Sequence, residues 1–170
     1  MRLKSTLLIA ILFLSGQWLY SQEPSKKETE DWLLKKIQIF NIYNEWNNFW
    51  FDEEGRFHIE YIFSEPELNS YGNYNHKVIP LKTIDAIEIF EKQDPKTKEN
   101  FVQLFFYSSE ENIVIILGDN KNQNQSSYKS KEESIVFNAE VKEDDMINRI
   151  QKAFIHLIEL NGGKLDKDVF

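Results

Sequence analysis

Cysteine is absent from the 170 residues of this chain. Its absence excludes disulfides, thiol catalysis, zinc–thiolate sites and the lipidated cysteine of a lipoprotein. Histidine is scarce, with 3 residues, and this leaves few nucleophile–base pairs. Serine nucleophile elbows, Walker loops and HExxH zinc motifs are also missing. We therefore predict a protein that is not an enzyme and that uses no cofactor.

Positive charge is in deficit, with 20 Lys and Arg against 28 Asp and Glu and a net charge of −8. Binding to nucleic acid or to an anionic bilayer requires a basic surface. The short basic groups, Lys26-Lys27 and the pair Lys129 and Lys131, lie close to acidic residues. The composition thus predicts no nucleic-acid partner, while the 41% of hydrophobic residues suffices for the core of one domain.

The longest apolar run, Leu7–Leu14, is shorter than the 20 or so residues that span a bilayer. It follows the positive charges of Arg2 and Lys4, and small residues such as Ser21 come after it. This order is typical of a secretory signal peptide. We predict a signal peptide over residues 1–21, cleaved after Ser21.

Cleavage would leave Gln22 at the new terminus and, without Arg2 and Lys4, a net charge of about −10. The segment resembles the signals of exported proteins from diderm bacteria, so we expect a periplasmic or secreted protein without a transmembrane segment. The alternative is an uncleaved anchor, in which Trp18–Tyr20 lengthens the apolar stretch.

The mature chain reads as one domain, because no internal repeat or second core is visible. We predict a linker over residues 22–27, a single α+β domain over residues 28–163 and a tail over residues 164–170. The oligomeric state is left open.

Helical periodicity occurs near both ends of this domain. Leu33 and Ile37 share a helical face in a predicted helix from about Lys26 to Phe40, and Ser25 with Glu28 fits a capping box at its start. The clearest element is a C-terminal helix with an apolar stripe and Asp144 as its N-cap, ended by residues 161–163. The stripe contains Met146, Ile147, Ile150, Ala153, Phe154, Leu157 and Ile158.

Between the helices the apolar residues alternate with a period of two, which is typical of strands. Seven strands are predicted, with loops over residues 64–75 and 119–133. The strands cover residues 49–51, 57–63, 78–79, 84–91, 101–107, 112–117 and 134–141. Seven antiparallel strands would form a sandwich or a partly open barrel, and the C-terminal amphipathic helix would cap its open end.

This order of elements resembles the pleckstrin-homology-like (PH-like) architecture, as do the segments Lys77–Ile89 and Arg149–Leu160. The resemblance covers roughly residues 49–162, and the helix from Lys26 is additional to it. It implies a fold that serves some proteins as a phosphoinositide-binding module and others as a peptide or protein scaffold. The first turn between strands is acidic here, Asp52-Glu53-Glu54-Gly55-Arg56, so phosphoinositide binding is not expected.

Two groups of side chains are candidate ligand or catalytic sites. His58 and Glu60 share a strand face, and His76 brought near them would complete a set of two histidines and one carboxylate that suits a metal. The simpler interpretation is an exposed strand face and a loop histidine, and we predict no metal. The acidic runs, such as Glu143-Asp144-Asp145, are interpreted as solvated turns rather than acid–base pairs.

An aromatic cluster is the candidate ligand-binding or partner-binding site. Such residues either join the first helix to the sheet or, if exposed, stack on a ligand or partner. We predict an exported binding domain for a protein, a peptide or an envelope component, at a strand edge or at a groove beside the last helix. The alternative is a carrier of a small apolar ligand in an aromatic-lined cavity. The cluster comprises Tyr43, Trp46, Phe49, Trp50 and Phe51.

Overall fold

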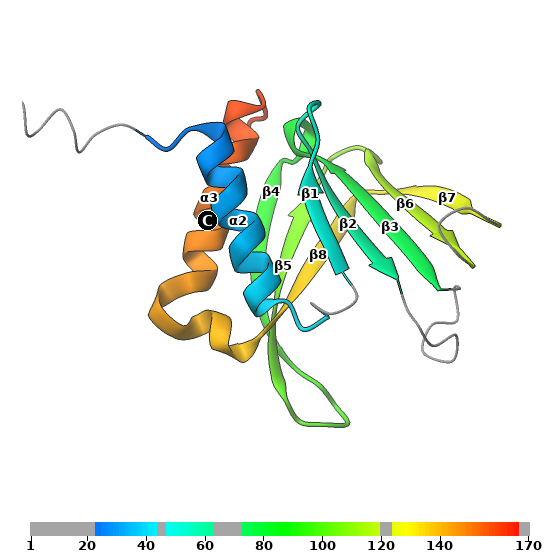
Figure 1. The fold of residues 1–170 in the computed structure, drawn as a ribbon, viewed down its shortest axis with the longest axis vertical. Coiled ribbons are helices and arrows are strands. Elements are labelled where there is room, and N and C mark those ends of the chain that lie inside the picture. Colours follow the sequence, from blue (N-terminus) through cyan, green and yellow to red (C-terminus); the bar gives the residue numbers. More distant parts are fainter. Residues whose placement is uncertain (1–22, 44–46, 63–72, 120–123, 167–170) are drawn as a thin grey trace, which may run out of the picture.

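The computed structural model describes residues 23–43, 47–62, 73–119 and 124–166. The predicted signal peptide lies outside these residues. The described chain begins with helix α2 (Lys26–Phe40), continues through eight strands and ends with helix α3 (Met146–Leu160) (Figure 1). The strands are β1 (Asn47–Phe51), β2 (Arg56–Ile62), β3 (Tyr74–Pro80), β4 (Ala86–Gln93), β5 (Asn100–Tyr107), β6 (Ile113–Gly118), β7 (Ser126–Ser130) and β8 (Glu132–Asn138).

Two antiparallel sheets form a sandwich-like α+β fold. One sheet has the strand order β1-β2-β3-β6-β7 and the other has the order β4-β5-β8. The two helices lie side by side at one end of the sheets (Figure 1). The predicted α+β sandwich with a helical cap is therefore confirmed, and within the described residues the sheets do not close into a barrel.

Helix α2 has the predicted bounds because its first turn is capped. The Ser25 hydroxyl accepts a bond from the backbone N–H of Glu28, and the Glu28 carboxylate accepts one from the backbone N–H of Ser25 at 2.9 Å. This exchange satisfies two N–H groups that an uncapped helix leaves exposed. The helix buries Leu33 and Ile37 against the sheets.

Strand β7 lies within residues 119–133, where the sequence pattern predicts only a loop. It pairs with β6, with Ser130 opposite Ile113 and Ser126 opposite Leu117. Four of its five residues are exposed. The strand is held by backbone pairing at the edge of the sheet, so it leaves no apolar alternation to detect. Strand β3 also begins inside a predicted loop, at Tyr74, because polar residues separate Tyr74 from the apolar pair Val78 and Ile79.

The predicted N-cap of the last helix is also wrong. Asp144 and Asp145 adopt left-handed backbone angles, with φ of 50° and 58°, and neither side chain caps the helix. Strand β8 ends at Asn138, and a 3-10 segment over residues 139–145 leads into α3. Asp tolerates the left-handed region better than most residues do, so this pair serves the bend into the helix rather than its cap.

Three phenylalanines join the two sheets to the last helix. Phe57 comes from β2, Phe106 from β5 and Phe154 from α3, and all three are fully buried. Their ring centroids are 4.9 Å apart for Phe106–Phe154, 5.2 Å for Phe57–Phe154 and 6.4 Å for Phe57–Phe106. These separations allow edge-to-face and tilted contacts, which add to the burial of apolar area.

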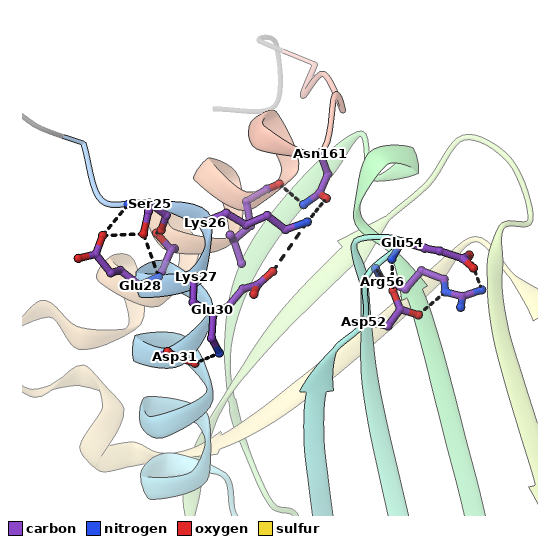
Figure 2. Close-up of polar contacts among 12 residues, drawn as sticks. Ser25, Lys26, Lys27, Glu28, Glu30, Asp31, Asp52, Glu54, Arg56 and Asn161 are labelled. Carbon is purple, nitrogen blue, oxygen red and sulfur yellow. Dashed lines mark hydrogen bonds and ion pairs between the residues drawn. The ribbon is translucent and has the colours of Figure 1, made fainter.

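The start of α2 and the end of α3 meet at one corner. The Lys26 ammonium donates to the Asn161 side-chain oxygen at 2.8 Å (Figure 2). The β1–β2 turn reaches the same point through Gly55, which has a φ of +74°. A Cβ atom at position 55 would lie 2.0 Å from the Asn161 oxygen, so a larger residue would displace the Asn161 side chain and would also strain the backbone at this positive φ.

Helix α3 offers a matched pair of variants that tests this core. Phe154→Ala leaves a cavity where both sheets meet the helix, and we expect it to lower the free energy of unfolding by about 3–5 kcal/mol. Leu160→Ala lies on the same helix, but its side chain is 48% exposed, and the expected loss is below about 0.5 kcal/mol. Urea denaturation followed by circular dichroism measures both values, and equal losses would contradict the proposed role of Phe154.

Among the described residues, no helix is both long enough and apolar enough to cross a membrane.

Candidate functional site

The predicted aromatic cluster is divided by the alternation of β1. Phe49 and Phe51 point into the core, where their ring centroids lie 6.2 and 5.0 Å from that of Phe57. Trp50, between them, points to the opposite face and stacks on His58 at 4.7 Å. Successive side chains of a strand alternate between faces, so these three residues cannot share one surface.

The other two members of the cluster precede the strand. Tyr43 is 39% exposed and contacts the ring of Tyr61 edge-on at 6.4 Å. Trp46 lies outside the described residues. The described members therefore divide between the core, the outer face of β1 and a position near the end of α2.

A different aromatic surface lies on the outer side of the three-stranded sheet. All buried residues of its strands share the inner face, as shown by Val102, Leu104 and Phe106 of β5. None of the residues on the other face is buried. We call this side the aromatic face, because it carries Phe90, Phe101, Phe105 and Tyr107.

The side chains of the aromatic face stack on one another. The centroids of Phe90 and Phe105 are 5.4 Å apart in an edge-to-face contact, and those of Phe105 and Tyr107 are 5.8 Å apart with nearly parallel planes. The Lys92 ammonium lies 5.2 Å from the Phe105 centroid. Phe90 remains 39% exposed. The contacts thus hold the rings in place, while Phe90 stays exposed and Phe105 and Tyr107 stay partly exposed.

Acidic groups border one end of this surface. Burial raises the pKa of the Tyr107 hydroxyl, and the nearby carboxylates of Glu88 and Glu132 raise it further. A phenolate is disfavoured beside negative charge, so Tyr107 stays a neutral hydrogen-bonding group at the rim.

A hollow of about 800 Å³ continues the aromatic face at its other end. We call it the end groove; Ile42, Tyr43, Phe101, Val136 and Asn138 are among its lining residues. The segment after α2 that lines the groove is bonded to the edge of β8. The Asn41 side chain and the Ile42 backbone N–H both donate to the Val136 carbonyl, at 2.9 and 3.3 Å. The groove lies outside the packed core between the sheets.

The sequence did hold a signal for the aromatic face. Residues 101–107 read Phe-Val-Gln-Leu-Phe-Phe-Tyr, so both faces of β5 carry large apolar side chains. A strand with one solvated face normally alternates between apolar and polar residues. This departure from alternation is the signal in the sequence for apolar side chains on both faces of β5.

A polar row lies on the outer face of the five-stranded sheet. The His58 Nε2 atom is 2.8 Å from the Asp52 carboxylate, and its Nδ1 atom is 2.9 Å from the His76 Nε2 atom. Trp50 stacks on both imidazoles, with centroids at 4.7 Å from His58 and 5.3 Å from His76. We call Asp52, His58 and His76 the histidine row.

The strand face that carries His58 and Glu60 was predicted to be exposed, and this was wrong. His58 is 7% and Glu60 is 3% exposed. Glu60 accepts hydrogen bonds from the Asn48 amide at 3.1 Å and from the Tyr74 hydroxyl at 3.2 Å. Burial and the Glu60 carboxylate raise the pKa of Tyr74 to about 12. The polar groups are therefore buried with partners, as buried polar groups generally are.

Asp52 is the fixed charge at the start of the row. Its carboxylate accepts bonds from the backbone N–H groups of Glu54 and Arg56 and from His58. It also accepts one from the Arg56 guanidinium at 2.6 Å (Figure 2). Burial acts to raise the pKa of Asp52, but the bonds from Arg56 and His58 outweigh it and lower the pKa to about 2. Arg56 also pairs with Glu54 at 3.0 Å, so two carboxylates engage the arginine of this turn.

His58 and His76 are brought together, whereas Glu60 binds other partners. Within the described ranges, no group of three or more His, Asp or Glu side chains has an arrangement that could hold a metal ion. The row depends on a turn and on the β2–β3 register, and neither can be read from residue spacing alone.

Searches against family models, curated proteins and solved structures found no match to this chain. The resemblance to PH-like domains therefore stays a prediction.

The lowered pKa of Asp52 predicts a pH-dependent contribution to stability. The charged form is favoured in the folded protein, so the contribution is complete above the ordinary pKa of 3.8 and is lost as the pH falls toward about 2. Asp52→Asn should cost about 1–2 kcal/mol at pH 7, because solvent screens part of the interaction. The difference in unfolding free energy between wild type and variant should shrink below pH 4 or so.

Asp31→Asn is the matched control, since Asp31 is paired with Lys27 on the surface and its side chain is 57% exposed. Its cost should stay below about 1 kcal/mol. Chemical denaturation at a series of pH values gives both curves. A cost of Asp52→Asn that is constant down to pH 2 would contradict the assignment.

Proposed function

We propose that this chain is an exported, non-enzymatic binding module that holds a protein or peptide partner on the aromatic face. The observation that carries the proposal is the stacked group of Phe90, Phe105 and Tyr107 on a sheet face without a buried residue. Aromatic side chains are enriched in the centres of protein interfaces, where they contribute much of the binding free energy.

The geometry of the face supports a preformed interface. The rings contact each other, so little side-chain entropy is left to lose when a partner binds. Contiguous apolar patches on a monomer often mark interaction sites. The carboxylates of Glu88 and Glu132 near Tyr107 favour a partner segment that combines apolar side chains with basic groups.

A small-ligand carrier is the second candidate function, and the end groove is the observation that favours it. Its volume of about 800 Å³ is in the range of small-molecule sites, and Tyr43 and Phe101 line it. The space between the sheets does not favour a carrier, because Phe57, Phe106, Phe137 and Phe154 fill it and are fully buried.

The partner proposal is tested by a photo-crosslinking amino acid placed on the surface. Position 90 on the aromatic face should crosslink one protein or peptide in envelope extract. Position 128 on β7 is the control, because Tyr128 is 52% exposed and lies in the other sheet. Crosslinking at 128 but not at 90, or at neither position, would contradict the proposal.

The crosslinked partner then gives a quantitative test. Phe90→Ser should weaken its binding at least about tenfold in isothermal titration calorimetry, as expected for an interface aromatic. Tyr128→Ser should leave the affinity unchanged. If native mass spectrometry instead finds a bound small apolar molecule that is lost on Tyr43→Ser, the carrier function takes the place of the partner function.

Export is tested separately. Expressed with residues 1–21 in a diderm bacterium, the chain should appear in the periplasm or medium with Gln22 as its first residue, as measured by mass spectrometry. Replacing Arg2 and Lys4 by Glu should hold the unprocessed chain in the cell, because a signal peptide needs its positive start. An exported wild-type chain that still carries residues 1–21 would favour the anchor.

A further inference from the structure

We propose that the end groove binds an arginine side chain of the partner that the aromatic face holds. The inference rests on the proposed function, because it names one residue of that partner and the place where the residue binds. Phe101 belongs both to the aromatic face and to the lining of the groove. A peptide that lies along the aromatic face therefore reaches the groove without leaving the sheet.

The floor of the groove is made by two cross-strand pairs of β5 and β8. Phe101 lies opposite Asn138, and all four residues of the two pairs line the groove. The second pair is Gln103 with Val136. The groove is thus built on the outer face of the three-stranded sheet, beside the side chains that form the aromatic face.

Two side chains of this floor have an unmet hydrogen-bonding capacity. The side-chain oxygens of Gln103 and Asn138 are shielded from water and have no hydrogen-bond partner among the described residues. Buried acceptors without a donor are costly, and most of those in native proteins are paired. Both side chains line the groove, and their terminal torsions are broad, so a small rotation turns either oxygen toward a bound donor.

The border of the groove is acidic. Asp94, Glu99 and Glu140 line it, and no basic side chain does so among the described residues. Lys92, a basic residue of the same sheet, lies over the Phe105 ring instead, with its ammonium 5.2 Å from the centroid. Three carboxylates around one hollow attract a cation and repel an anion.

The β4–β5 turn holds one side of this border in place. The Asp94 carboxylate accepts hydrogen bonds from the backbone N–H groups of Lys96 and Thr97, at 2.7 and 2.8 Å. The Asp94 backbone is also bonded to those of Lys98 and Glu99, at 3.0 and 2.9 Å. The side chains of Lys96 and Lys98 are exposed and do not line the groove. The Asp94 carboxylate is therefore positioned before a ligand arrives.

The remaining walls favour arginine over lysine. Ile42 and Tyr43, which are 40% and 39% exposed, line the groove together with Phe101 and offer apolar and aromatic contact area. A guanidinium is planar, stacks on aromatic rings and is more weakly hydrated than an ammonium. It also presents five N–H donors against three for lysine, so it can bond amide oxygens and carboxylates at the same time.

The test uses a model ligand, N-acetyl-arginine methylamide, with N-acetyl-citrulline methylamide as its matched control. Citrulline keeps the shape of arginine and lacks the charge. Each compound is titrated into isotope-labelled mature chain, and binding is measured from the amide signals in NMR spectra. The arginine compound should shift the side-chain amide signals of Gln103 and Asn138, and the citrulline compound should bind at least about tenfold more weakly.

Three variants test the residues of the groove, with the fold of each checked by circular dichroism. Glu140→Gln should weaken the arginine compound about threefold, because it removes one border charge. Glu110→Gln is its control and should bind as wild type does, since Glu110 is also exposed but lies between β5 and β6 and does not line the groove. Gln103→Met keeps the length of the side chain, removes the acceptor, and should weaken binding about fivefold.

The outcomes separate this inference from the proposed function. Equal binding of the two compounds, shifts that lie outside the groove, or a Gln103→Met chain that binds as wild type does would each overturn the arginine site. None of these results affects crosslinking at position 90, which tests the partner itself. Phe90→Ser should leave the arginine compound bound, because Phe90 does not line the groove. In the crosslinked partner, replacing the bound arginine by citrulline should weaken binding at least about tenfold, and an unchanged affinity for every such replacement overturns the inference.

Discussion

The contact on which the rest of this structure depends is the junction of Phe57, Phe106 and Phe154. Each ring comes from a different layer, so burying one of them requires the other two elements to be in place. A domain without cysteine gains no stability from covalent links, and packing of this kind has to hold its layers together. The two sheets and α3 are therefore expected to fold as one cooperative unit.

Because this junction fills the inner layer, the distinctive chemistry of the chain lies on its outward faces. The three-stranded sheet presents the aromatic face, with Phe90 and Phe105 supported by stacking. The five-stranded sheet presents the histidine row, in which His58 is buried and stacks on Trp50. One outer face is therefore mainly aromatic, and the other carries a hydrogen-bonded row of polar side chains.

The sequence predicted what local patterns control. The capping pair Ser25 and Glu28 placed the start of α2 correctly, and apolar periodicity identified both helices and most strands. It did not predict β7, which has no apolar pattern, or the histidine row, which forms only through the turn at Asp52 and the pairing of β2 with β3. The sequence also did not show that the β1 members of the predicted aromatic cluster point to opposite faces, with Phe49 and Phe51 toward the core and Trp50 away from it.

The contact between Lys26 and Asn161 brings the beginning and the end of the described fold to one corner. Chains whose ends lie close together tolerate circular permutation, provided that the new ends open at an exposed turn. The exposed turn over residues 95–98, between β4 and β5, is such a place. A permuted chain opened there would carry its new ends beside the end groove, where a reporter protein could be fused to sense occupancy directly.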